Sequence, residues 1–193
     1  MSAALIFLDP FQSIGEIDGM GLDTMQRILV IGNPGAGKST LAAKLGERLN
    51  LPVIHLDQHF WKPGWVETEK TVWRGMVQQL VSGESWVIDG NYDSSHDIRF
   101  PRADTIIYFD FPTRLCLWRI IWRILGSHGQ IRPDMAAGCP ERFDFEFIKW
   151  VWRFRKDVRP KIPGNIKRYF KGDRLVILKN SRDVADFLAG ISG

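Results

Sequence analysis

The octapeptide Gly32-Asn33-Pro34-Gly35-Ala36-Gly37-Lys38-Ser39 matches the pattern G-x-x-x-x-G-K-[ST] at every fixed position. An apolar run over 28–31 precedes it, and an amphipathic pattern over about 38–49 follows it. Glycines let such a loop curl so that its N–H groups point at phosphate oxygens, and the following helix adds its positive end. The octapeptide therefore predicts a site for a nucleoside triphosphate. A plain glycine turn is the competing interpretation.

The residue types in this loop predict separate roles. Lys38 is expected to neutralise the β- and γ-phosphates as a point charge, and the Ser39 hydroxyl to ligate Mg²⁺. The residues expected to hold the nucleotide are Gly32, Asn33, Pro34, Gly35, Ala36, Gly37, Lys38, Ser39 and Thr40. The motif alone does not separate a kinase from an ATPase or a GTPase.

Outward from the loop, short apolar runs alternate with helical periodicity. The runs predict strands near 28–31, 53–56, 86–88, 105–109 and 174–178. The periodic segments predict helices near 38–49, 67–81, 112–125, 143–158 and 182–191. This alternation predicts an α/β fold with parallel strands and helices on both faces. Ligands in such folds bind beyond the carboxyl ends of the strands, so the residues that follow each strand are the candidate ligand-binding residues.

Two aspartates follow predicted strands. Asp57 ends the run Val53-Ile54-His55-Leu56, and Asp89 ends Trp86-Val87-Ile88. Phosphoryl transfer needs a carboxylate near Mg²⁺ and benefits from another that positions the acceptor. We assign Asp89 to the Mg²⁺ shell and Asp57 to the acceptor. Capping or turn roles are the alternatives for both.

The segment after the second strand is aromatic. In 57–65, Trp61 and Trp65 are expected to wall the acceptor pocket or, alternatively, to pack against the next helix. Asn91, Tyr92 and Arg99 are polar candidates for the same cavity.

The histidines His55 and His59 flank Asp57. The glutamate of an H-E-x-x-H motif is missing, and His55 lies in a predicted strand. A packed or substrate-facing role is therefore favoured over metal binding.

The helix predicted over 112–125 carries Arg119 and Arg123 on one face, at i and i+4. Trp118 and Trp122 lie on an adjacent apolar face. The arginines are expected to contact the triphosphate, because guanidinium groups bind phosphate oxygens in a bidentate manner. Solvated arginines on an amphipathic helix are the alternative.

A Gly/Pro-rich segment over about 126–145 carries Arg132 and Arg142. A loop this long in a compact domain is usually functional, so we expect a lid that closes over the phosphates, with Arg132 among the catalytic residues. The basic, aromatic run 143–156 follows it. This run is expected to form a core face through Phe147, Trp150/Val151 and Phe154; stacking on single-stranded nucleic acid is the alternative.

Composition and charge bound the remaining possibilities. The chain has 193 residues, of which 45% are hydrophobic and 25% charged, which fits one globular domain and excludes wholesale disorder. Up to Pro112 there are 9 basic and 14 acidic residues, and after it 17 basic and 8 acidic. The basic second half suggests an anionic partner, and solvated surface charge is the alternative.

The ends and the cysteines add little chemistry. Residues 1–25 lack a basic region and a long apolar run, so they are expected to be a loosely held extension before a domain over 26–193. No apolar run reaches about 18 residues, which predicts no transmembrane helix and no membrane partner. Cys116 and Cys139 form no motif, and a cytoplasmic protein with two free thiols is expected.

These motifs together resemble the P-loop proteins labelled topology modulation proteins, or FlaR-like, which in turn resemble adenylate kinases and other small nucleotide and nucleoside kinases. The resemblance covers about Arg27 to the C-terminus and rests on the phosphate loop and on the segments 55–65, 86–92, 112–123 and 132–142. It implies a three-layer α/β/α fold with strand order 2-3-1-4-5 and a helical lid. It also implies that Arg119 and Arg123 hold ATP and that residues 180–182 lie near adenine. Asn91-Tyr92 departs from the adenylate kinase pattern, which puts AMP as the acceptor in doubt.

The sequence therefore predicts an ATP- and Mg²⁺-dependent kinase that acts on a small nucleotide- or nucleoside-like acceptor. Lys38, Asp57, Arg119, Arg123 and Arg132 are its expected catalytic residues. An ATP-dependent nucleic-acid-associated regulator and a simple ATPase are the alternatives. Nucleic acid is a less favoured partner, and the chain is expected to be a monomer or a homodimer.

Overall fold

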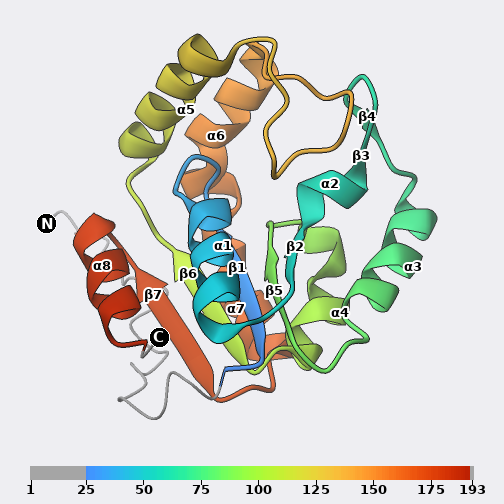
Figure 1. Ribbon diagram of the computed structural model, residues 1–193, viewed down its shortest axis with the longest axis vertical. Coiled ribbons are helices and arrows are strands. Elements are labelled where there is room, and N and C mark those ends of the chain that lie inside the picture. Colours follow the sequence, from blue (N-terminus) through green and yellow to red (C-terminus); the bar gives the residue numbers. More distant parts are fainter. Residues whose placement is uncertain (1–24, 192–193) are drawn as a thin grey trace, which may run out of the picture.

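A computed structural model describes residues 25–191, and its main feature is a five-stranded parallel sheet. The strand that leads into the phosphate loop, β1 (Arg27–Gly32), lies at its centre (Figure 1). The other strands are β2 (Val53–His55), β5 (Trp86–Asp89), β6 (Thr105–Phe109) and β7 (Arg174–Leu178). Their order, β2-β5-β1-β6-β7, is the predicted 2-3-1-4-5 once a separate small hairpin is left out of the numbering.

The register of the sheet places polar side chains of neighbouring strands at one edge. β1 is buried from Ile28 to Gly32, as expected of a strand that helices cover on both faces. β5 pairs Asp89 with Val30 on one side and with His55 on the other. The ends of three neighbouring strands therefore meet beside the phosphate loop.

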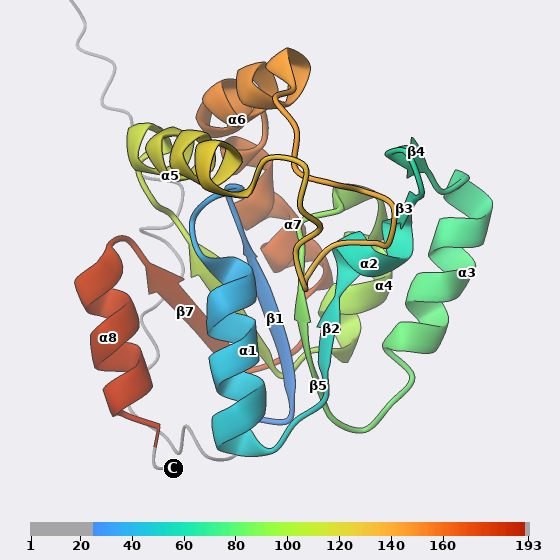
Figure 2. The ribbon, with the colours of Figure 1, turned by 45° about the horizontal axis from the view of Figure 1, so that its top comes forward.

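Helices cover both faces of the sheet (Figure 2). One face carries α1 (Lys38–Leu49) and α8 (Ser181–Ala189). The other carries α3 (Lys70–Leu80), α4 (His96–Arg99) and α7 (Ile162–Tyr169). Each face has its own buried apolar cluster, which gives the predicted three-layer α/β/α arrangement.

Two further helices lie at the end of the sheet where the phosphate loop is. They are α5 (Thr113–Ser127) and α6 (Phe145–Asp157), which pack on each other around Ile120 and Val151. The segment 128–144 joins them and extends toward the region after β2 (Figure 1). This segment occupies the position of the predicted lid, as a loop without regular helix.

The region after β2 is more regular than predicted. The sequence indicated an aromatic loop over 57–65, but the structure has the short helix α2 (Leu56–Phe60) and a hairpin of β3 (Trp61–Lys62) and β4 (Val66–Glu67). The described part also contains 3-10 turns at η2 (Asp93–Ser95), η3 (Phe100–Arg102) and η4 (Arg159–Lys161).

Helix boundaries differ from the prediction where side chains cap the first turn. The helix predicted from 67 begins at Lys70, because the Glu69 carboxylate accepts hydrogen bonds from the N–H groups of Thr71 and Val72. The helix predicted from 143 begins at Phe145, after the cap Asp144. Helix α7 was not predicted, since Pro and Gly in its first turn mask its periodicity.

The expected N-terminal extension lies outside the described residues except for Met25, which is fully buried. Both cysteines are free and buried. None of the described helices is long and apolar enough to cross a membrane.

Candidate active site

The phosphate loop joins β1 to α1 and is shaped by its glycines. At Gly35 the backbone has φ +77°, and a Cβ atom there would lie 2.5 Å from the Cys116 carbonyl oxygen of α5. Only glycine permits that close approach. Gly37 is the N-cap of α1 and has no side chain to offer, so the first N–H groups of the helix have no side-chain cap. The loop therefore fits an anion at the helix N-terminus.

Lys38 lies folded over the loop. Its Nζ donates to the Asn33 carbonyl oxygen at 3.2 Å. Burial lowers the pKa of Lys38, while the negative charges of Asp89 and Asp57 act in the opposite direction. The two predicted carboxylates thus lie close enough to interact with the lysine. Thr40, two residues further along α1, is exposed.

Asp89 lies between two partners. Its Oδ2 accepts a hydrogen bond from the Ser39 hydroxyl at 2.6 Å, and its Oδ1 is 2.6 Å from His55 Nδ1. The hydrogen bond with Asp89 is the main cause of a raised pKa at His55. His55 therefore belongs to the site as the partner of a carboxylate, a contact that the sequence did not reveal.

The Ser39 and Asp89 oxygens fit a magnesium ion. Mg²⁺ prefers hard oxygen ligands and is commonly held by one or two protein groups together with substrate phosphates. Within 25–191 there is no group of three or more His, Cys, Asp or Glu residues that would hold a metal ion on its own. Metal binding by His55 and His59, the less favoured alternative, therefore has no third protein ligand among the described residues. Ser39 and Asp89 would hold an ion that neutralises charge on the β- and γ-phosphates.

Asp57 stands in the first turn of α2, opposite this pair. The Tyr92 hydroxyl donates to its Oδ1. Burial raises the pKa of Asp57, while the Tyr92 hydrogen bond and the charge of Lys38 counteract the rise. A carboxyl group with a raised pKa near a phosphate site has the properties of a residue that orients or deprotonates a hydroxyl.

Two residues predicted to face the acceptor, Asn91 and Arg99, bond backbone groups of the protein. The Asn91 side chain bonds both backbone groups of Gly32: its Nδ2 donates to the carbonyl at 2.7 Å, and its Oδ1 accepts from the N–H at 2.9 Å. Arg99 is fully buried and donates to the carbonyl oxygens of Gly90, Asn91 and Tyr92. Asn91 thus ties the segment 89–92 to the phosphate loop, and Arg99 holds the same segment to α4.

Arg119 joins the loop to the last strand–helix junction. Its Nη1 donates to the Ala36 carbonyl oxygen at 3.0 Å, and its Nη2 donates to the Ser181 hydroxyl at 3.1 Å. Its guanidinium group also lies over the Phe111 ring, 5.4 Å from the centroid. Arg119 is therefore beside the loop, where the sequence had placed it.

Arg123 and Arg132 meet at a residue that the sequence analysis did not single out. Glu141 Oε1 is 3.0 Å from Arg123 Nε and 2.7 Å from Arg132 Nε, and Glu141 is only 5% exposed. Arg132 also donates from Nη1 to Asp134 at 2.9 Å. The carboxylate thus fixes one arginine of α5 and one of the lid. No local sequence pattern predicts that two arginines meet at one buried glutamate.

The lid lies against the hairpin after α2 (Figure 2). The Gly64 N–H donates to the Gly138 carbonyl oxygen at 2.9 Å, and Trp65 Nε1 donates to the Pro140 carbonyl oxygen at 3.1 Å. Trp61 packs edge-to-face on Trp65, with 5.5 Å between ring centroids. Both tryptophans contact the lid residues Met135, Ala136 and Cys139. They pack on the lid, a partner that neither sequence interpretation named.

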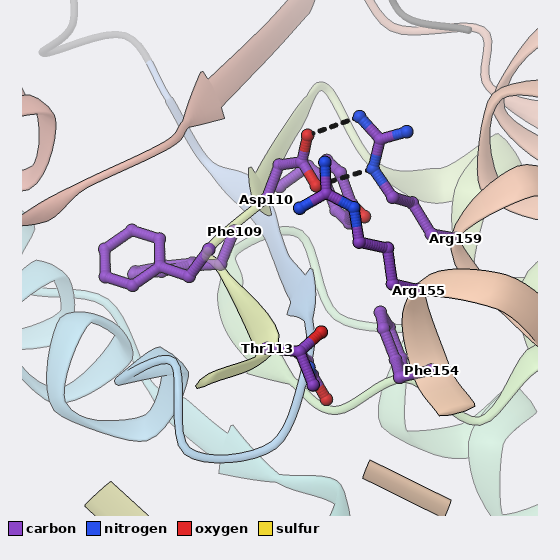
Figure 3. Close-up of a pocket in the computed structure, with 9 residues that line it drawn as sticks. Phe109, Asp110, Thr113, Phe154, Arg155 and Arg159 are labelled. Carbon is purple, nitrogen blue, oxygen red and sulfur yellow. Dashed lines mark hydrogen bonds and ion pairs between the residues drawn. The ribbon is translucent and has the colours of Figure 1, made fainter. Parts of the chain in front are cut away.

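A small cavity lies behind the loop (Figure 3). Its volume of about 10 Å³ accommodates one water molecule and no nucleotide. Beside it, Arg159 Nε and Nη2 donate to the two Asp110 carboxylate oxygens at 2.7 and 2.6 Å, which ties the end of β6 to the segment after α6 (Figure 3). This ion pair supports the scaffold.

The aromatic helix α6 is only partly as predicted. Val151 and Phe154 are buried, but Trp150, expected in the core face, is 42% exposed. At this level Val151 packs with Ile120 and Ile124 of α5, so only one narrow face of α6 is buried there.

Comparisons with known proteins identify the fold. No known family model matches the sequence, and no curated protein matches it. Among the solved structures that resemble it, two cover most of both chains. Shikimate kinase from Acinetobacter baumannii in complex with shikimate has a TM-score of 0.55 at 17% identity, with 88% of this chain and 92% of that chain covered. A gluconokinase from Sinorhizobium meliloti 1021 has a TM-score of 0.50 at 17% identity, with 86% and 91% covered.

These likenesses, with the phosphate loop and the strand order, define the class: the chain has the fold of the small P-loop kinases. Identities this low establish the fold alone. The narrower resemblance to topology modulation proteins and to adenylate kinases stays a prediction from the sequence.

Proposed function

We propose that this protein is an ATP- and Mg²⁺-dependent kinase that transfers the γ-phosphoryl group to a hydroxyl or phosphate of a small molecule. The observation that carries the proposal is the meeting of Lys38, the Ser39–Asp89 pair and Asp57 at one edge of the sheet. Phosphoryl transfer is catalysed mainly by positioning and electrostatic stabilisation, which these groups supply.

Each residue has a distinct task in this proposal. Ser39 and Asp89 hold Mg²⁺, and the loop N–H groups with Lys38 hold the β- and γ-phosphates. Arg119 and Arg123 stabilise negative charge from α5, and Arg132 does so from the lid. Asp57 orients the acceptor and accepts its proton when the acceptor group is a hydroxyl.

A docked lid favours a kinase over a bare ATPase. The lid contacts the hairpin through main-chain and tryptophan hydrogen bonds, so it covers the side of the site where Asp57 lies. Closure of this kind excludes water and favours transfer to the acceptor.

The proposed acceptor is a small molecule that carries a hydroxyl or a phosphate group. The sequence resemblance favours a nucleotide- or nucleoside-like acceptor, whereas the structural neighbours are a gluconokinase and a shikimate kinase bound to shikimate. A nucleoside, a polyol or a hydroxy acid would present a hydroxyl to the γ-phosphate, and a nucleotide would present a phosphate oxygen. The acceptor class is therefore a small molecule with a free hydroxyl or phosphate, and the assay distinguishes nucleosides, nucleotides, polyols and hydroxy acids.

The test is ATP consumption by the wild type in the presence of such a panel, with Lys38→Ala as the inactive control and Lys44→Ala as the matched control on the same helix. One acceptor class should raise turnover well above slow hydrolysis in the wild type and in Lys44→Ala only. If no compound raises turnover above hydrolysis, the kinase proposal fails and an ATPase replaces it.

A further inference from the structure

One face of α5 carries a row of apolar side chains that no described part of the chain covers. Trp118, Ile121, Trp122 and Leu125 are 58%, 45%, 58% and 69% exposed. Their spacing of i, i+3, i+4 and i+7 places them in one stripe along the helix. We call these four residues the α5 stripe. Helix α5 lies at the outer boundary of the molecule (Figure 1).

The opposite side of α5 is already used. Ile120 and Ile124 are buried between α5 and α6, and Arg119 and Arg123 reach the phosphate loop and the lid. The α5 stripe is therefore not needed to hold the helix in place. Because exposed apolar surface is stabilised by burial, a further binding partner would cover it.

The exposed apolar area of the α5 stripe is as large as that of many interaction surfaces. An aromatic side chain contributes roughly 150–250 Å² of surface, so the four residues together expose on the order of 400–500 Å². Single exposed apolar residues are ordinary, but continuous patches of about 300–600 Å² are the largest on typical monomers and are often functional.

We propose that the α5 stripe is the core of an interface between two copies of this chain, with the two α5 helices antiparallel across a two-fold axis. Two stripes supply about 900 Å² of apolar surface, which is close to the apolar share of a standard interface of about 1,600 Å². An antiparallel arrangement centred between Ile121 and Trp122 sets Trp118 of one copy against Leu125 of the other. The stripe is then self-complementary, as a two-fold interface requires.

The charges on α5 favour this partner over a lipid surface. Arg114 is exposed at the N-terminal end of the helix, where its charge opposes the helix dipole. The last turn of α5 carries no basic residue. In the antiparallel arrangement Arg114 lies beside the last turn of the second copy, whose carbonyl ends attract a cation. Each copy thus supplies the charge that the other helix end lacks.

The first test is the mass of the full chain in solution by sedimentation velocity over a range of concentrations. The wild type should have twice the mass of one chain. Ile121→Glu and Trp118→Glu should lose the dimer, because each places a charge inside the apolar interface. Val72→Glu, which alters a residue that is 54% exposed on α3, should remain dimeric. Circular dichroism should show that all variants keep the wild-type fold.

The second test fixes the geometry. Ile121→Cys should be joined efficiently to a second copy by a short bismaleimide, because the residue lies next to the axis. Val72→Cys should not be joined, and Cys116 and Cys139 are buried and should not react. A wild type that is monomeric at every concentration would overturn the proposal, as would a dimer that persists in Ile121→Glu. Binding to anionic lipid vesicles by a monomer, lost in Ile121→Glu, would assign the stripe to a membrane surface and overturn it too.

Discussion

The Ser39 hydroxyl donates a hydrogen bond of 2.6 Å to Asp89 Oδ2, although the two residues are 50 positions apart in the chain. The contact exists because the parallel sheet sets β5 beside β1, so the end of one strand lies against the loop that follows the other. One residue belongs to the phosphate-binding motif and the other to a strand end that carries no motif of its own. Their contact defines the position at which the proposed metal ion is held.

Replacing Asp89 with Asn should lower kcat by at least about 100-fold, since metal-ion stabilisation of a transferring phosphoryl group is worth several kcal/mol. The folded protein should still bind ATP without Mg²⁺, because the loop N–H groups are unchanged. Kinetics as a function of Mg²⁺ concentration measure the effect, and Asp97→Asn, an aspartate paired with Arg74 away from the loop, is the control. Activity near the wild-type level in Asp89→Asn would remove this residue from the metal site.

Replacing Tyr92 with Phe should move the acidic limb of the kcat/KM profile to higher pH. The Tyr92 hydrogen bond stabilises the ionised form of Asp57 and so lowers its pKa, against the effect of burial, which raises it. Without the hydroxyl the pKa of Asp57 rises further, and the carboxylate is protonated at a higher pH. An acidic limb that stays in place, or moves to lower pH, would show that Asp57 is not the group that the profile reports.

Replacing His55 with Asn should destabilise the fold at low pH only. The raised pKa of His55 means that its proton stabilises the native state fully below the ordinary imidazole pKa of about 6.5, and that this stabilisation is lost as the pH rises through the raised value. Hydrogen bonds to charged groups contribute about 1.5–3 kcal/mol, which is the expected loss in urea unfolding near pH 5.5.

His59→Asn is the control for that experiment. Burial lowers the pKa of His59, so its removal should make the protein relatively more stable as the pH falls. Equal losses at acidic and alkaline pH in His55→Asn would contradict a protonated His55 in the native state.

Replacing Glu141 with Gln should lower kcat about tenfold while changing the KM for ATP much less. The carboxylate holds Arg123 and Arg132 at 3.0 and 2.7 Å, and a loosely held arginine loses much of its effect on a transition state. Glu141→Asp should recover part of the rate. Glu146→Gln, in a residue whose side chain is 79% exposed, should have no effect. A rise in KM alone would assign Glu141 to nucleotide binding instead.

Most of the fold follows from the sequence because its strands are continuous apolar runs and its first loop is a complete motif. Residues 105–109 and 174–178 are strands with the predicted bounds. Local patterns also located Lys38, Ser39, Asp57 and Asp89, since each stands in the motif or at a strand end. Residues that follow parallel strands lie at the same edge of the sheet, so their position at a strand end is enough to predict that they come together.

The rest depends on contacts between distant segments, which no local pattern contains. Glu141 looks like an ordinary loop residue until Arg123 and Arg132 meet at it. Arg99 looks like an acceptor ligand, but its guanidinium group finds backbone carbonyl oxygens in the interior. Trp118 and Trp122 look like core residues at helical spacing, yet α5 buries its other face.

The central claim is that the γ-phosphoryl group moves to an organic acceptor rather than to water. The direct measurement follows ATP labelled in the γ-phosphate during turnover with the compound that raises ATP consumption, and separates the labelled products. Most of the label is expected in a phosphorylated acceptor, and Lys38→Ala should abolish this product. Label found only in inorganic phosphate, whatever acceptor is present, would contradict transfer to an organic acceptor.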